Sequence, residues 1–460
     1  MRWRNGIAAV LLTLAWEGAA ALDLAGAWRA ALAADHEYGA ARAAGLAGQT
    51  RRAQADGLWR PEVALAATAG IGIAETATSG ARFAAPGFGQ SNGVSFNTSV
   101  NHGASGRLAL TARHPLISAE RQAAGRRLEI GAEAATREVE AARQALGLRV
   151  AETYFDLAVA AESARVLARQ RTAVDRALEQ ARERFALGDV PVTDVHEAAA
   201  RAEAVRAQVL AAQTEIAVRR AALADITGLD ADGLAAAAPV RAVPLADLPA
   251  LPAALAAADA GSPLLRLRAA DVEAARQEAA RQAAGAGTAV DLVAQFARDR
   301  IAGSGDFGSA TAGATSGLVG VQISVPFDLG GVRRARHAEA LHLVEKAEAE
   351  LRRARQQVAA QARAAWLALD AGRARLGALA EAHKASLARL DATRLGRAVG
   401  HRTTLDLLNA EADAAQAELG LLRARVALAM DRLRLAAAGG AIDEALLTAI
   451  DTTLEPASGG

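Results

Sequence analysis

The chain has 460 residues, nearly equal numbers of basic and acidic side chains (52 and 51), and no cysteine. A net charge of +1 provides no field that would attract nucleic acid. The absence of cysteine excludes disulfides, thiolate metal sites and a cysteine nucleophile. The eight histidines are scattered, and only His337 and His342 come near ligand spacing, so neither a metal site nor another cofactor is expected.

The first residues, 1–21, are predicted to be a secretory signal peptide. The basic start MRWRN precedes the apolar run GIAAVLLTLAW, and Ala19 and Ala21 offer a small-residue cleavage site. The mature chain is therefore expected to begin near Leu22; the alternative is an ordinary N-terminal helix. No later stretch of 18 or more residues is apolar and uncharged, and there is no cysteine that could carry a lipid anchor.

Residues 22–228 are expected to form a first structural repeat: a helix, two strands and a long helical hairpin. Apolar residues alternate with small or polar ones over 63–73 and 108–113, which is typical of strands with one apolar face. The Gly-, Ser- and Asn-rich residues between these segments predict a long exposed loop. A charged, Ala- and Leu-rich run over 117–187 then predicts one very long helix, and a second helix is expected over 195–226.

Residues 229–262 are expected to form a proline-rich connector, residues 263–440 a second structural repeat, and residues 441–460 a C-terminal tail. In the second repeat, two further alternating segments flank the predicted loop IAGSGDFGSATAGATSG. The strands are expected over 290–296 and 321–325, and the helices over 271–284, 332–395 and 407–438.

Equal spacings indicate an internal duplication. Pro115 and Pro326 follow corresponding strands about 210 residues apart, and the pattern of Gly, Asp and Ala at the two helical turns recurs at nearly the same offset. Four strands cannot close a barrel, and lipid does not tolerate open sheet edges. If these strands span a membrane, several chains must therefore pool them. Three chains would supply an even-numbered, closed barrel of twelve strands. A soluble mixed α/β protein with two small hairpins is the alternative, and it leaves the helix lengths unexplained.

Short segments along the chain resemble, in the same order, segments of the TolC family of outer-membrane exit ducts. They are AETYFDLAVAAE (151–162), RFALGDVPVTDVHEA (184–198), ITGLD (226–230), VQISVPFDLGG (321–331) and VGHRTTLDLLNAE (399–411). The resemblance covers residues 22–450. It implies an α+β membrane protein: a homotrimer with a 12-stranded β-barrel, four strands per chain, continued by a 12-helix periplasmic α-barrel. It also implies location in the outer membrane of a Gram-negative cell, with extension into the periplasm, and an equatorial belt built from the connector and the tail.

Each helical hairpin is predicted to turn at a glycine in the left-handed conformation, Gly188 in the first repeat and Gly400 in the second. Pro191 cannot continue the first helix. Each following helix is expected to begin with a capping pair, which is Asp194 with Glu197 in the first hairpin and Thr403 with Asp406 in the second.

The resemblance also implies that these hairpins close the periplasmic tip of the duct through polar links and acidic rings. The matching link residues are Thr193, Asp194 and Arg402. Asp406 matches the first constriction aspartate. Arg397 takes the place of the family's link tyrosine, and Asn409 that of the second constriction aspartate. We hypothesise that Asp194 and Arg402 form an ion pair that holds the tip shut, and that Arg397 supplies a second contact to Asp194.

No motif in the chain indicates an enzyme. The sequences GLVGVQ and DLGG lack the Lys-Ser/Thr of a phosphate-binding loop, and no serine or histidine has the context of a catalytic triad. The resemblance therefore implies a passive duct that works with a periplasmic adaptor and an inner-membrane ABC or other transporter. Type I secretion of a polypeptide is the first expectation, because the lipid-anchor cysteine is absent. Efflux of small molecules, drugs or metals is the alternative, and a soluble periplasmic coiled-coil scaffold ranks lower.

Overall fold

The computed structural model describes residues 22–87, 89–245, 248–285, 287–306, 308–327 and 329–454. The predicted signal peptide, 1–21, and the last six residues of the predicted tail lie outside the described residues.

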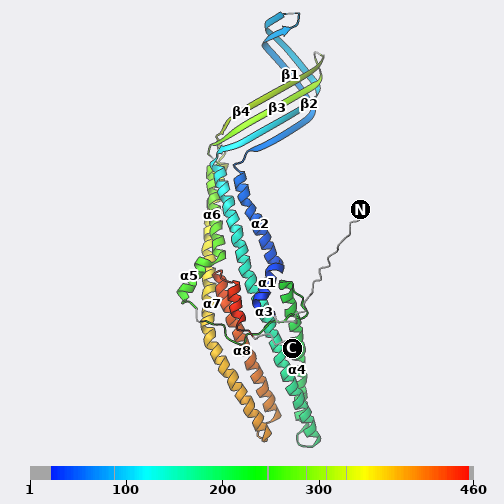
Figure 1. The fold of residues 1–460 in the computed structure, drawn as a ribbon, viewed down its shortest axis with the longest axis vertical. Coiled ribbons are helices and arrows are strands. Elements are labelled where there is room, and N and C mark those ends of the chain that lie inside the picture. Colours follow the sequence, from blue (N-terminus) through cyan, green and yellow to red (C-terminus); the bar gives the residue numbers. More distant parts are fainter. Residues whose placement is uncertain are drawn as a thin grey trace, which may run out of the picture. The chain divides into compact units, whose positions relative to one another are not determined.

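The helices and strands follow one order that occurs twice (Figure 1). The first set is α1 (Leu24–Ala34), α2 (His36–Gly57), β1 (Glu62–Ala85), β2 (Gly89–Ile117), α3 (Ala119–Ala186) and α4 (Val192–Thr227). The second set is α5 (Leu251–Gly261), α6 (Pro263–Ala284), β3 (Ala289–Gly305), β4 (Gly308–Ser324), α7 (Val332–Ala398) and α8 (Thr404–Ala438), followed by α9 (Glu444–Asp451). Every helix expected from the sequence is present. The helix expected over 271–284 begins earlier, at Pro263, where the second repeat is expected to start, and the connector contains α5.

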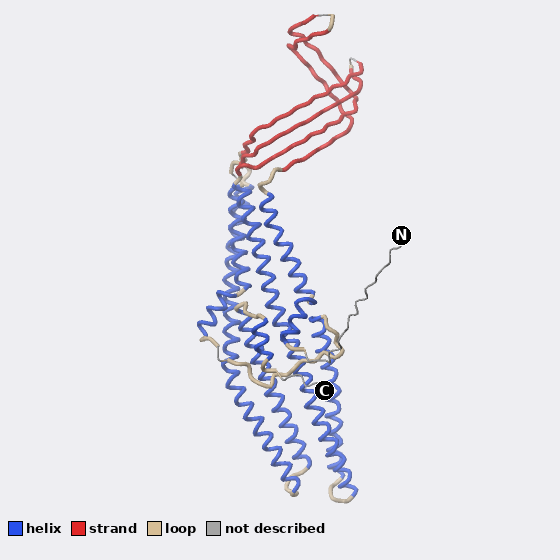
Figure 2. The backbone as a smooth tube through the Cα atoms, in the orientation of Figure 1, coloured by secondary structure: helices blue, strands red, loops and turns tan. Residues whose placement is uncertain are grey.

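The described residues pack into two units. The first comprises the described residues within 1–46, 135–268 and 350–460; the second comprises those within 47–134 and 269–349. All the strands drawn red in Figure 2 belong to the second unit, and the two helical turns belong to the first.

The second unit contains an antiparallel sheet in the order β1-β2-β3-β4. Its register places Leu65 opposite Leu110, and Leu110 opposite Phe296, so these side chains share one face. Large apolar side chains on this face are exposed; Leu65, for example, is 68% exposed. The outer sides of β1 and β4 have no partner strand within the described residues. A sheet with one exposed apolar face and two open edges needs both lipid and further strands.

The prediction of two long loops between the strands is wrong, because most of these residues continue the strands. β1 runs to Ala85 and β2 begins at Gly89, while β3 runs to Gly305 and β4 begins at Gly308. The ladder pairs backbone groups, so Gly, Ser, Thr and Ala can extend it without an apolar alternation. Register shifts near Gly72 and Ala81 accompany this change in composition.

The other face of the sheet carries two cross-strand ion pairs. Arg113 Nη2 lies 2.5 Å from Asp291 Oδ2, and Arg107 Nε lies 3.6 Å from Asp299 Oδ1. Asp291 is only 1% exposed, so its charge requires the arginine beside it. The two faces thus differ in polarity, as lipid-facing and interior faces of a membrane barrel do.

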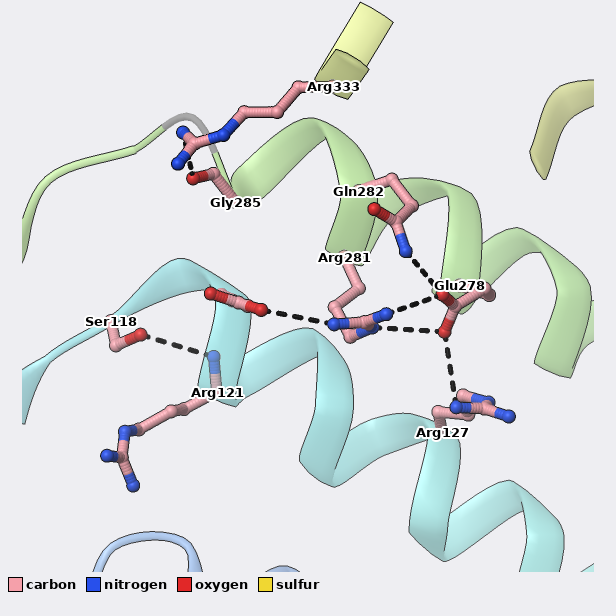
Figure 3. A network of polar contacts seen from close by, with 9 residues as sticks. Ser118, Arg121, Arg127, Glu278, Arg281, Gln282, Gly285 and Arg333 are labelled. Atoms are coloured by element: carbon pink, nitrogen blue, oxygen red, sulfur yellow. Dashed lines mark hydrogen bonds and ion pairs between the residues drawn. The ribbon is translucent and has the colours of Figure 1, made fainter. Parts of the chain in front are cut away.

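The ends of the helices nearest the strands are joined by an arginine-rich network (Figure 3). Arg281 bonds to Glu278 (Nη2 to Oε1, 2.7 Å) and pairs with Glu120 (Nη1 to Oε1, 3.1 Å), and Arg127 pairs with the other oxygen of Glu278 at 3.2 Å. The hydrogen bond from Arg281 holds the pKa of Glu278 below its ordinary value. These contacts join α3 to α6, so both repeats contribute to the network.

The largest buried side chains of the first unit gather around Trp28, Tyr154 and Phe155. The backbone N–H of Ala237, in the connector, donates to the Tyr154 hydroxyl at 3.0 Å, and burial raises the pKa of that hydroxyl. The carboxylate of Asp451 accepts from the first two backbone N–H groups of α1, at 2.8 and 3.0 Å. The connector and the C-terminal segment therefore both pack against the N-terminal helix and α3.

Candidate functional site

The two helical hairpins of the first unit end their first helices in the same way. Gly188 and Gly400 both have φ of +79°, the left-handed conformation that glycine adopts without strain. The N–H of Asp189 donates to the Arg184 carbonyl, and the N–H of His401 donates to the Gly396 carbonyl, each at 2.8 Å. The N–H of Gly188 donates to the Phe185 carbonyl at 2.9 Å, and the N–H of Gly400 donates to the Arg397 carbonyl at 3.1 Å, so each turn is a Schellman motif. The predicted left-handed turns are confirmed at both positions.

The second helix of the first hairpin begins differently from the prediction. α4 starts at Val192, and Pro191 is its N-cap, with no side-chain capping bond. Asp194 is therefore not the N-cap; it is the third residue of the helix, where its charge complements the helix dipole. Pro191 explains the shift, because its fixed φ suits a helix start and its missing N–H needs no partner. Thr193 and Asp194 are exposed in the first turn of α4.

The second helix of the second hairpin begins with the predicted capping box. The Asp406 backbone N–H donates to Thr403 Oγ1 at 3.1 Å, and the Thr403 backbone N–H donates to Asp406 Oδ2 at 3.0 Å. The hydrogen bond from the Thr403 backbone lowers the pKa of Asp406, and Arg402 and Arg389 add smaller effects in the same direction. Asp406 thus has a structural role in the helix that carries it.

Arg397 joins the two hairpins within one chain. Its Nη2 donates to Gln180 Oε1 of α3 at 2.5 Å, so within the described chain its partner is Gln180 and not the hypothesised Asp194. The side chain of Arg402 lies over Gly396, where an added Cβ would come 2.9 Å from Arg402 Cγ. Among the described residues of the single chain, no ion pair joins Arg402 to Asp194.

An apolar contact between the hairpins accompanies this polar link. Leu408 of α8 is 4% exposed and packs in one cluster with Val174 of α3 and with Val205 and Val209 of α4. Sequence reasoning missed this contact, because nothing in the heptad pattern of α8 says which helix lies opposite Leu408. Leu408 also lines a groove of about 160 Å³ between α3, α4 and the start of α8, and Asp194 and Thr403 line it as well.

Ion pairs continue this contact farther along the helices. Arg169 of α3 lies 2.7 Å from Glu418 of α8. Within the second hairpin, Arg389 of α7 lies 2.6 Å from Asp413 of α8. Asn409 is exposed. The site therefore consists of two capped turns, one apolar contact and a set of polar links.

Nothing in this arrangement indicates catalysis. Across the described ranges, no group of three metal-ligating side chains lies close enough to hold an ion. No helix within those same ranges has the length and apolarity needed to cross a membrane.

The sequence matches the profile of outer membrane efflux proteins over residues 22–229 and 254–441. The chain belongs to this family. Two curated relatives align over short stretches: TolC of Vibrio cholerae, 41% identical over 61 residues, and BepC of Brucella suis, an outer membrane efflux protein, 31% identical over 106 residues. The alignments span 13% and 23% of this chain, and 14% and 23% of these relatives' lengths.

Solved structures show the same fold over nearly the whole chain. The outer membrane protein VceC of Vibrio cholerae superposes with a TM-score of 0.70 at 21% identity, covering 91% of this chain and 96% of VceC. The CmeC outer membrane channel of Campylobacter jejuni superposes with a TM-score of 0.75 at 15% identity, covering 99% of this chain and 98% of CmeC. The predicted TolC-family fold, with four strands per chain and a long helical part, is confirmed, and so is the outer-membrane location.

Proposed function

We propose that three copies of this chain assemble into the outer-membrane exit duct of a tripartite export system. The observation that carries this proposal is the four-stranded sheet, with one exposed apolar face and two edge strands that have no partner in the described chain. Three such sheets, joined edge to edge, make a closed barrel of twelve strands with a polar interior. The long helices of the three copies then form the periplasmic tube.

The duct itself performs no chemical step. The energy for transport comes from an inner-membrane transporter, an ABC protein or another class, which is coupled to the duct by a periplasmic adaptor. Type I secretion of a polypeptide is the proposed use, since the chain has no cysteine that would make it a lipoprotein of the drug-efflux type. Efflux of small molecules is the second candidate, because the curated relative BepC is named an efflux protein.

Deletion of the chromosomal gene separates these two uses. Loss of one or a few polypeptides from the culture medium, with unchanged growth in the presence of drugs, dyes and metal salts, supports type I secretion. A fall in drug, dye or metal tolerance with an unchanged set of secreted proteins supports efflux. Salt-resistant, detergent-soluble trimers in the outer-membrane fraction test the duct itself, and a protein that salt removes from membranes would contradict it.

We propose that the tip of the duct is held shut by ion pairs between Asp194 of one copy and Arg402 of the next. Two observations support this proposal. Asp194 is exposed in the first turn of α4, and Arg402 is exposed in the turn between α7 and α8. An exposed ion pair contributes about 0–1 kcal/mol, so three pairs would bias the gate by up to about 3 kcal/mol. Single-channel conductance of Asp194→Ala and Arg402→Ala assemblies in planar bilayers should therefore rise. Conductance that stays at the wild-type level in both variants would remove these pairs from the gate.

A further inference from the structure

The apolar stripe of β4 continues past the end of the strand. Along β4, apolar residues occupy alternate positions from Val319 to Ile323, on the exposed apolar face of the sheet. The alternation goes on at Val325, Phe327 and Leu329, which are 50%, 82% and 95% exposed. The last paired row of the sheet ends at Ser324, so these three side chains lie beyond the ladder. Nothing in the described part of the second unit covers them.

Basic residues follow directly on this stripe. Val332 begins α7 and is 56% exposed, and the next residues include Arg333, Arg334 and Arg336. Arg333 donates to the Gly285 carbonyl at 2.8 Å, which fixes the first turn of α7 to the end of α6 (Figure 3). Arg334 and Arg336 are exposed. The first turn of α7 contains no acidic residue, and cations at a helix N-terminus oppose the helix dipole, so the dipole of α7 does not favour basic residues at this position.

We propose that this junction inserts into the periplasmic leaflet of the outer membrane and binds the phosphates of anionic phospholipids. The junction patch consists of Val325, Phe327, Leu329, Val332, Arg334 and Arg336. Its apolar members continue the lipid-facing stripe by the length of a few residues, and its cations come where that stripe ends.

The order of side chains matches the order of layers in a leaflet. β4 has 17 residues, and a membrane strand needs about 9–11 to cross the hydrocarbon layer, so the strand is long enough for the residues just beyond its paired end to reach the headgroup level. Apolar and aromatic side chains favour the boundary between acyl chains and headgroups, and arginines favour the phosphates outside it. Each arginine near an anionic lipid surface strengthens binding by about fivefold. A neutral, zwitterionic lipid offers the same apolar layer without this gain.

The arginine part of the proposal is tested by counting bound lipids. The full chain, purified as its assembled form in detergent, is titrated with phosphatidylglycerol or with phosphatidylethanolamine, and native mass spectrometry measures bound lipid. We expect selective binding of phosphatidylglycerol, and binding about 30-fold weaker in the double variant Arg334→Gln, Arg336→Gln. The matched control, Arg352→Gln with Arg353→Gln, removes two exposed charges farther along α7 and should bind as the wild type does. Equal binding of both lipids, or unchanged binding by the double variant, would overturn the proposal.

The apolar part is tested separately, by a method that does not depend on the charge variants. Because the chain contains no cysteine, Phe327→Cys or Leu329→Cys supplies a unique site for a nitroxide spin label. In vesicles that contain phosphatidylglycerol, we expect the label to collide with dissolved oxygen and to be protected from a water-soluble nickel complex. Exposure to the nickel complex would place the junction in water. Protection from both reagents, with an immobilised label, would place it under a neighbouring copy of the chain; either result refutes insertion.

Discussion

Truncation of one buried leucine should open the tip more readily than loss of the polar link beside it. Leu408 is 4% exposed and is the contribution of α8 to a cluster built by α3 and α4. Leu408→Ala removes three carbon atoms, about 2.4 kcal/mol at 0.8 kcal/mol for each, before any cost of the cavity. Measured truncations of this kind cost about 2–5 kcal/mol. The Arg397–Gln180 hydrogen bond is exposed to solvent, which reduces its contribution below the value of about 1.5–3 kcal/mol for a hydrogen bond to a charged group.

If the tip opens by separating the hairpins of each chain, opening breaks the Leu408 contact. Leu408→Ala therefore destabilises the closed state and not the open one. A loss of about 2 kcal/mol in one chain shifts a two-state equilibrium about 30-fold towards the open form. Single-channel recording of purified assemblies in planar bilayers should show longer open times for Leu408→Ala than for Arg397→Gln. Leu210→Ala is the matched control, because Leu210 lies on α4 and is 58% exposed. The reasoning fails if Arg397→Gln opens the duct while Leu408→Ala behaves as the wild type.

Two further predictions concern the helical turns. In the folded chain the pKa of Asp406 lies below its ordinary value of 3.8. The stability that the ionised carboxylate contributes is therefore fully present above pH 3.8, and it is lost as the pH falls through the lowered pKa of the folded chain. The midpoint of denaturation should thus differ between wild type and Asp406→Ala at pH 7, and the difference should vanish in strong acid; a difference independent of pH would contradict the assignment. Gly188→Ala places a side chain at φ +79° where nothing lies within 4 Å of the new Cβ, so backbone strain alone should cost about 1–2 kcal/mol. Thermal unfolding measures it, and an unchanged melting temperature would show that the turn relaxes.

The sequence predicted the kinds of elements better than their extents. Alternating apolar residues located each strand where one face meets lipid, at 63–73 for example. This pattern missed the second half of β1, residues 74–85, where Gly, Ser, Thr and Ala show no apolar alternation but still pair through the backbone. In the same way, the left-handed glycines were predictable because few other residues adopt that conformation.

The contacts between the two repeats could not be predicted from the sequence. The resemblance to TolC proteins gave Arg397 as a departure from the pattern, but its partner, Gln180, lies 217 residues away on another helix. The capping pair expected at Asp194 was wrong because Pro191 three residues earlier already supplies the start of the helix. In both cases the outcome depends on which neighbouring group lies within bonding distance in the folded chain, and the sequence pattern does not show this.

The structural role of Asp406 and its proposed place in a carboxylate ring can be separated by experiment. The cap uses one oxygen, Oδ2, as acceptor for the Thr403 N–H, so the other oxygen remains able to face an ion. Asp406→Asn keeps an acceptor for that N–H and removes the charge, whereas Thr403→Ala removes a capping oxygen and keeps the charge. A ring of carboxylates favours cations at a narrow mouth. We therefore expect Asp406→Asn to weaken cation selectivity and block by multivalent cations, and to be less stable than the wild type at pH 7 but not in strong acid. Thr403→Ala should lose about 1 kcal/mol of stability and keep its selectivity. If both variants alter stability alone, Asp406 only caps α8, and the constriction must be sought elsewhere.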